Sequence, residues 1–376
     1  MIQRDIAEVF PPGVFIKEEL EARGWSQAEL AEIIGRLPYE VSNLISGKTA
    51  VSPAIAKELG EAFDTSPEFW MNLESSYQLH RAKATDEAVS RRAKLYGRWP
   101  IREMVKRHWL EPSANVDVLE QRVMSFFGLP ALDADVPFAY AMRQAARETT
   151  SSHTAWLCRA GQLARAVHAS PFSERSFKSG LSELKRLLSN AQDVRRVPAA
   201  LAEAGIRFLV VEHLPTTRID GVAFWLDAKA PVIALSLRYD RIDWFWFTLA
   251  HELGHLSRRD GLEAKVVIDT DLVGDTTVPE EQESEAEQRA SEFAAEFLIT
   301  QSELDNFIAR VSPLYSPMKI RGFASRIGVH PGIVVGQIQH REKNYTIHRS
   351  MLEKVRTTVT QSSLTDGWGQ SPPIFS

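Results

Sequence analysis

Cysteine is nearly absent from this chain of 376 residues, which contains only Cys158. A single thiol cannot form an intrachain disulfide framework, and it excludes zinc sites built from several thiolates. The most apolar runs, 208–211 and 244–250, are far shorter than the roughly 18 residues of a membrane span. The first ten residues carry charged side chains where a secretory leader needs an apolar run. We therefore expect a cytoplasmic protein with no membrane contact.

The chain also lacks the excess of positive charge that is typical of general nucleic-acid binders, since its net charge is −5. Residues 11–75 contain five Lys/Arg and eleven Asp/Glu, a net charge of −6. Residues 81–110 contain nine Lys/Arg and three Asp/Glu, a net charge of +6. This reversal indicates that two neighbouring segments have different surfaces. The basic side chains either contact phosphates or form a solvated helix face; they include Arg91, Arg92, Lys94, Arg98, Lys106 and Arg107.

The composition, with 44% apolar and 25% charged residues, is typical of a globular protein, and the length predicts two or three domains. Helical periodicity dominates, and three runs rich in Val, Ile and Phe predict strands at 206–211, 221–226 and 232–237. The expected fold is mainly α with a small β-sheet (α+β). We expect an N-terminal helical domain, a helical middle region, a C-terminal domain and a tail that is mobile from Thr357. The corresponding boundaries are 1–78, 79–199, 200–345 and 346–376.

An H-E-x-x-H motif occupies residues 251–255, within a predicted helix over 244–258. His251 and His255 are four positions apart, so on a helix both imidazoles lie on one face and can bind one metal ion. Glu252 lies about 100° further round the helix axis, where it can act as a general base on water without binding the metal. Two histidines that stack by chance are the alternative interpretation. The motif predicts a zinc ion that polarises a substrate carbonyl.

A catalytic zinc needs a third protein ligand and one open position. Arg258 and Gly261 stand where the extended motif H-E-x-x-H-x-x-G-x-x-H has its glycine and last histidine, so that arrangement is excluded. A glutamate from the next predicted helix, 281–299, is the other common solution. Glu287 is the best placed, because small and apolar residues continue its face, and Glu283 is the second choice. One more solvated carboxylate in an acidic run is the alternative.

Two further residues bear on this site. Ser291, one turn after Glu287, can hydrogen-bond a metal-ligating histidine. His330 precedes Pro331, which favours a structural turn residue over a catalytic one.

The residues around the motif resemble the ImmA/IrrE family of bacterial metallopeptidases. The resemblance rests on four runs and covers roughly residues 200–340; the runs are 220–225, 232–236, 247–256 and 287–299. It implies a zinc-dependent, zincin-like peptidase domain that acts on a partner such as a repressor, with Glu287 as the third zinc ligand. Ser291 replaces the Asp or Asn that is usual in the family, and Thr300 replaces a usual Pro.

Two short predicted helices, 27–34 and 38–46, meet at Gly35 in the pattern of a helix-turn-helix. Ser26 and Glu29 fit a capping box at the start of the first helix. The second helix would lie in the major groove with its N-terminal residues on base edges. Candidate base contacts are the outward-facing residues Tyr39, Glu40, Ser42 and Asn43. Candidate phosphate contacts are Gln27, which can also reach a base, Arg36 and Lys48.

This segment resembles the HigA-type antitoxins of the XRE repressor group, through the runs 24–31, 45–48 and 65–70. The resemblance covers about residues 12–78. It implies operator DNA as a partner, and a homodimer that represses its own operon. The negative charge of the segment opposes strong DNA binding, so a protein-binding or dimerising helix-turn-helix is the alternative.

Together these features predict a helix-turn-helix transcriptional regulator with a zinc-dependent endopeptidase domain. Its protein partner would belong to a toxin–antitoxin circuit or to a stress or phage-repressor circuit. The alternative is a non-enzymatic DNA-binding antitoxin or regulator whose peptidase-like domain only senses a ligand or holds the fold.

Overall fold

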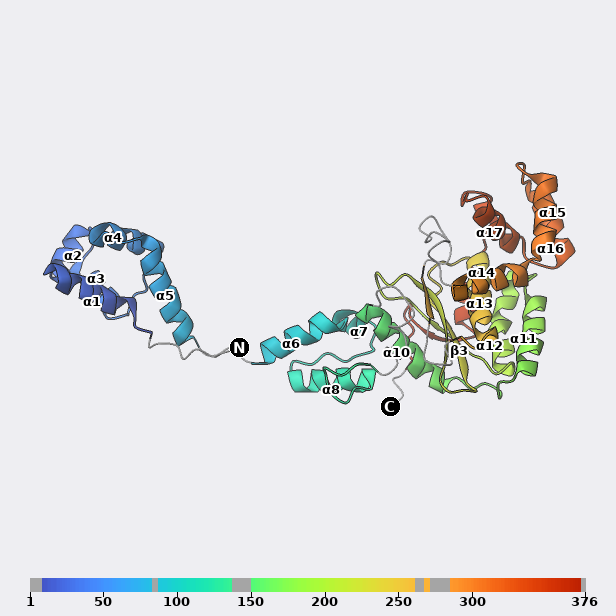
Figure 1. The fold of residues 1–376 in the computed structure, drawn as a ribbon, viewed down its shortest axis with the longest axis horizontal. Helices are drawn as coiled ribbons and strands as arrows, with labels where there is room; N and C mark the ends of the chain where they lie inside the picture. Colours follow the sequence, from blue (N-terminus) through green and yellow to red (C-terminus); the bar gives the residue numbers. More distant parts are fainter. Residues whose placement is uncertain (1–8, 83–86, 137–149, 261–266, 271–284, 373–376) are drawn as a thin grey trace. The chain divides into compact units, whose positions relative to one another are not determined.

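The computed structural model describes residues 9–82, 87–136, 150–260, 267–270 and 285–372 (Figure 1). The chain divides into two compact units, Met1–Val89 and Ser90–Ser376. The fold is mainly α with one small sheet, as the sequence predicts. None of the helices in the described ranges is long and apolar enough to cross a membrane. The boundaries predicted within the second unit stay predictions.

The first unit is a bundle of short helices (blue in Figure 1). In order they are α1 (Pro12–Arg23), α2 (Gln27–Ile33), α3 (Pro38–Ile45), α4 (Pro53–Phe63) and α5 (Pro67–Arg81). Ser26 and Glu29 form the predicted capping box, in which Glu29 N–H donates to Ser26 Oγ at 3.2 Å and Ser26 N–H to Glu29 Oε2 at 2.6 Å. The core includes Leu30 of α2, Leu44 of α3 and Trp70 of α5, and it fixes the helix-turn-helix pair α2–α3.

The second unit begins with a series of helices, and arginine side chains within or at the end of the first two form hydrogen bonds and ion pairs with later segments. They are α6 (Glu87–Arg98), α7 (Ile101–Lys106), α8 (Val116–Phe127), α10 (Ser151–Ala166), α11 (Glu174–Leu187), η1 (Ala191–Arg196) and α12 (Val197–Glu203). Arg91 pairs with Glu120, while Arg92 and Arg98 donate to backbone carbonyls. Arg107 pairs with Glu212 at 2.6 Å. Four of the six basic residues named for segment 81–110 thus make hydrogen bonds or ion pairs within this unit.

The sheet has the strand order β4-β2-β3-β1-β5. Its strands are β1 (Arg207–Val211), β2 (Ile219–Trp225), β3 (Pro231–Leu235), β4 (Val267–Thr270) and β5 (Leu364–Asp366). The first three confirm the predicted strands to within about two residues. Strand β1 is parallel to β3 and to β5, whereas β2 is antiparallel to β3 and β4. In the register of β2 with β3, Val222 lies opposite Ala234.

Helix α13 (Ile242–Ser257) packs on β2 and β3 and along α14 (Glu285–Leu298). Gly254 makes this helix pairing close, because a Cβ added there would lie 3.1 Å from Cα of Ala290. The elements that follow are α15 (Gln301–Val311), α16 (Pro317–Ile327), α17 (Pro331–Arg341), η3 (Arg349–Met351) and α18 (Arg356–Thr360).

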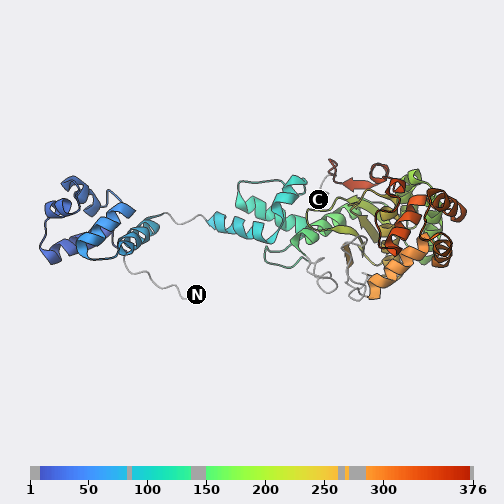
Figure 2. The same cartoon turned by 90° about the horizontal axis from the view of Figure 1, so that it is seen from above.

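The expectation of a mobile tail from Thr357 is wrong for residues up to 372. Strand β5 lies at the edge of the sheet, where Leu364 is the partner of Leu209 in β1 (Figure 2). Asp366 at its end is fully buried, accepts from Trp109 Nε1 at 2.9 Å and pairs with Arg159 at 2.6 Å. The glycines and prolines after residue 366 favour a loop, but the pairing of three residues before them depends on partners far away in sequence.

Candidate metal centre and DNA-binding helix

Helix α13 presents the two histidines of the motif towards α14. Apolar side chains on its other faces, among them Phe245, Leu249 and Leu253, pack into the core and fix the position of the helix. The side chains of His251 and His255 are 1% and 2% exposed. The carboxylate of Glu287, in the first turn of α14, is 21% exposed and lies beside them.

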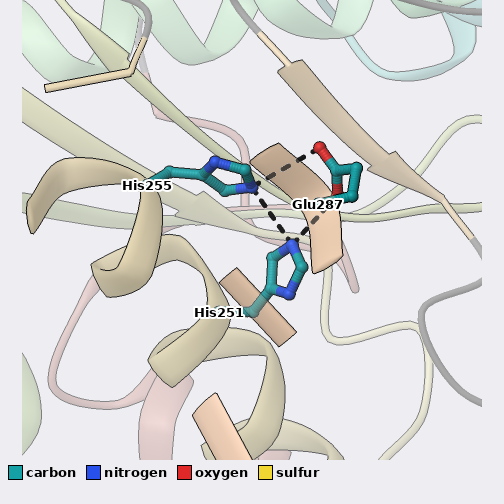
Figure 3. A group of neighbouring side chains, drawn as sticks. All are labelled: His251, His255 and Glu287. Atoms are coloured by element: carbon teal, nitrogen blue, oxygen red, sulfur yellow. Dashed lines mark hydrogen bonds and ion pairs between the residues drawn. The ribbon is translucent and has the colours of Figure 1, made fainter. Parts of the chain in front are cut away.

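The three side chains form a close triangle (Figure 3). Nε2 of His251 lies 3.1 Å from Nε2 of His255 and 3.2 Å from Oε2 of Glu287. Nε2 of His255 lies 3.6 Å from Oε1 of Glu287. The structure therefore brings together the three residues that the sequence singled out as metal ligands.

The donor set fits a zinc ion. Zinc bonds of about 2.0–2.1 Å in a tetrahedral site place neighbouring ligand atoms about 3.3 Å apart. The closest distances between the ligand groups, which involve both oxygens of Glu287, are 3.1 to 3.6 Å and lie close to that value. Two imidazole nitrogens also repel each other at 3.1 Å unless a proton or a cation lies between them.

The other ring nitrogen of each histidine has its own partner. Nδ1 of His255 lies 3.0 Å from Oδ2 of Asp260, and Nδ1 of His251 lies 3.3 Å from Oγ of Ser291. When Nδ1 carries the proton and donates to these oxygens, Nε2 keeps its lone pair for a metal. Sequence reasoning anticipated the reach of Ser291 but missed Asp260. The sequence offers one indication of the role of Asp260, namely that an acidic residue stands five positions after a candidate ligand histidine.

Glu252 is fully buried, on the side of α13 that faces the sheet. A Cβ added at Gly221 in β2 would lie 2.3 Å from Oε1 of Glu252 and 2.9 Å from Cγ2 of Thr248. The carboxylate therefore rests against bare backbone, and only glycine leaves room for it. Sequence reasoning missed this role of Gly221, because the contact joins positions 31 residues apart.

The two remaining candidates near the centre have different outcomes. Glu283, the second choice as a ligand, lies outside the described residues. His330 is the N-cap of α17, where its Nδ1 accepts from Gly332 N–H at 3.0 Å and its Nε2 lies 3.1 Å from Glu353.

The candidate DNA contacts differ in their availability. Gln27, Tyr39, Ser42 and Lys48 are exposed, and Asn43 is half-buried. Glu40 accepts the N–H of Leu37 at 2.9 Å and so caps α3. Arg36 donates to Oε1 of Glu58 at 3.0 Å, and this hydrogen bond raises the pKa of Arg36. Glu40 and Arg36 are thus bound to neighbours within the domain.

These two sites define a DNA-binding type of helical domain followed by a metallopeptidase-type domain. The family model for the helix-turn-helix matches residues 16–70, and the model for the IrrE N-terminal-like domain matches residues 203–335. The chain belongs to the XRE-type helix-turn-helix regulators that have HigA-like antitoxins among their members, and it joins an IrrE-like domain to them.

Several similar proteins each match a part of the chain. The HTH-type transcriptional regulator YddM of Escherichia coli is 34% identical over 84 residues, which are 22% of this chain and 88% of that protein. Antitoxin HigA-1 of Vibrio cholerae is 38% identical over 68 residues, 18% of this chain and 64% of that protein. The solved structure of Pseudomonas aeruginosa antitoxin HigA with the higBA promoter is 34% identical, covering 19% of this chain and 80% of that one, with a TM-score of 0.19.

Proposed function

We propose that this chain is a cytoplasmic, operator-binding regulator whose second unit is a zinc-dependent endopeptidase. One observation carries the peptidase half of the proposal. Three ligand atoms from α13 and α14, one from each of His251, His255 and Glu287, lie within 4.8 Å of one another, and Glu252 directly follows one of these residues in the chain. This is the donor set that a catalytic zinc uses when it keeps a fourth position for water or substrate.

His251, His255 and Glu287 would hold the zinc ion, while Asp260 and Ser291 hold the two imidazoles by their Nδ1 protons. A bound zinc supplies a Lewis acid that polarises the peptide carbonyl and makes water acidic. The Glu252 carboxylate would take a proton from the attacking water and then pass it to the leaving amine, so it must be deprotonated before the attack and its oxygens must be held in place. Gly221 provides the space in which those oxygens lie.

The DNA half of the proposal rests on the α2–α3 pair and on the HigA-like relatives. Two solved relatives were determined with DNA, a promoter for one and operator DNA for the other. For this chain we infer a homodimer that binds an operator, and a protein substrate that is a repressor or a toxin–antitoxin partner.

Metal content tests the metal centre first. Purified wild type is expected to carry about one zinc per chain by elemental mass spectrometry. The Glu287→Ala variant is expected to lose zinc, whereas Glu292→Ala, an exposed glutamate on the same helix, is expected to keep it. Wild type that neither contains nor takes up zinc on titration would remove the peptidase half of the proposal.

Cleavage tests the reaction. With zinc loaded, wild type should cut the protein encoded beside it, and Glu252→Gln should lower the rate about 10²–10⁴-fold without loss of zinc. Glu292→Gln is the control: it removes the charge of an exposed glutamate on α14 and should leave the cleavage rate unchanged. Normal cleavage by Glu252→Gln would contradict the assigned role of that carboxylate.

A second candidate function is a non-enzymatic regulator in which the metal centre only senses a ligand or holds the fold. The burial of the centre favours it, because Glu252 and His251 are fully buried and His255 is 2% exposed. Zinc that raises the melting temperature, together with operator binding and no cleavage of neighbouring gene products, would select this candidate.

A further inference from the structure

Three consecutive apolar residues lie exposed at the N-terminal end of α3. Leu37 is 55% exposed and Tyr39 is 63% exposed, and Pro38 between them is exposed as well. Helix α3 packs into the core through a different face, since Val41 and Leu44 are 0% and 3% exposed. The run 37–39 is therefore not part of the packing of this unit.

Charged side chains beside this run are already bound within the unit. Glu40 caps α3 by accepting from Leu37 N–H, and Arg36 pairs with Glu58. An acceptor for cytosine or a donor for guanine at these two positions would first have to break those bonds. The exposed side chains at the start of α3 therefore present mainly apolar surface, with the hydroxyl of Tyr39 as the polar exception.

The major groove presents one apolar group, the C5-methyl of thymine, and apolar side chains recognise it by contact. The first residues of a recognition helix are those that reach base edges. We propose that Tyr39 and Leu37 read thymine methyl groups and so set the sequence preference of the operator. This inference rests on the proposed DNA-binding function of α3, and it replaces base recognition by Glu40.

The full-length protein provides the test. Specific duplexes are first selected from a randomised DNA library, and affinity is then measured by fluorescence anisotropy. Each selected thymine is compared with deoxyuridine, which lacks only the methyl group. Burial of one methyl group contributes about 0.8 kcal/mol, so each contacted thymine should raise the affinity of wild type roughly fourfold over deoxyuridine.

Variants assign the contact to residues. Tyr39→Ala and Leu37→Ala should each bind thymine and deoxyuridine duplexes equally at the position that residue reads. Leu79→Ala is the matched control, because Leu79 is 74% exposed on α5 of the same unit, and it should keep the fourfold difference.

The outcomes distinguish failure of the proposed DNA-binding function from failure of the thymine-methyl inference. No selected sequence would remove the proposed DNA function and this inference with it. A selected sequence whose affinity does not change with deoxyuridine would overturn this inference alone. So would a Tyr39→Ala variant that discriminates normally but changes the oligomeric mass, which would assign the run to contact between copies.

Discussion

Asp260 contacts the ring nitrogen of His255 that points away from the candidate metal site. Its Oδ2 lies 3.0 Å from Nδ1 of His255, while Nε2 of the same ring faces the other two candidate ligands. The backbone supports the same contact, because Asp260 N–H donates to the carbonyl of His255 at 3.0 Å. At the other ligand histidine, His251, Nδ1 lies 3.3 Å from the hydroxyl of Ser291. The two imidazoles are therefore held by groups of different charge.

Zinc affinity should depend more on Asp260 than on Ser291. Replacing a carboxylate that holds a ligand imidazole typically lowers metal affinity about 10–100-fold, and we expect this loss for Asp260→Ala. Ser291→Ala should cost less, because a neutral hydroxyl makes a weaker hydrogen bond. Competition with a chelating dye measures both affinities. Equal affinities for wild type and Asp260→Ala would show that the contact does not orient the ligand.

Gly221→Ala should damage the reaction without removing zinc. The new Cβ would lie 2.3 Å from Oε1 of Glu252, so the carboxylate must move, while the three ligands lie on other elements. We expect normal zinc content and a loss of cleavage about as large as that for Glu252→Gln, about 10²–10⁴-fold. The control is Gly322→Ala in α16, where nothing lies within 4 Å and helix propensity should raise stability by about 0.5–1 kcal/mol. Full activity of Gly221→Ala would contradict this account.

Asp366→Ala should strongly destabilise the second unit. Arg159 and Asp366 are each 1% exposed, and removal of the carboxylate leaves a buried guanidinium without its charge partner. Such a loss typically costs about 3–5 kcal/mol. The exposed pair of Arg326 and Glu303 is the control, where Glu303→Ala should change the free energy of unfolding by less than about 1 kcal/mol. Urea denaturation of the full chain measures both, and similar values would refute the prediction.

The thiol of Cys158 should react slowly while the protein is folded. Burial raises its pKa to about 12, against the opposing charge of Arg165. At pH 8 the thiolate should be roughly a thousandfold rarer in the folded protein than in the unfolded chain, whose thiol pKa is about 8.5. Because the unfolded chain loses the thiol proton at a lower pH than the folded protein, the free energy of unfolding should fall as the pH rises from about 8.5 towards 12. Alkylation rates with and without urea test it, and similar rates would contradict the shift.

Local patterns were sufficient to predict much of the fold and the proximity of His251, His255 and Glu287. The strands at 207–211 and 231–235, the motif helix and the capping box at Ser26 all follow from periodicity or from short spacings. Glu287 could be proposed because the face of a helix is visible in sequence. These features depend on residues that are close together along the chain.

The features that sequence missed depend on distant partners. Arg36 stays a candidate phosphate contact, but its hydrogen bond to Glu58 in α4 could not be predicted, because no local pattern indicates that partner. Gly221 looks like an ordinary strand glycine until Glu252 is placed against it. Strand β5 has only three residues, and its pairing depends on β1 and on the buried partner of Asp366.

The order of the strands has a consequence for synthesis on the ribosome. Val210 in β1 pairs with Thr365 in β5, so one edge of β1 cannot pair until the ribosome has added a further 155 residues. At about 5–20 residues per second, translation of that interval takes roughly 8–30 s. During this interval the nascent chain has an unpaired strand edge, and Arg159 has no ion-pair partner because Asp366 has not yet been synthesised. The helix-turn-helix unit is complete before this interval begins, so its helices can fold first while the sheet still depends on residues yet to be added.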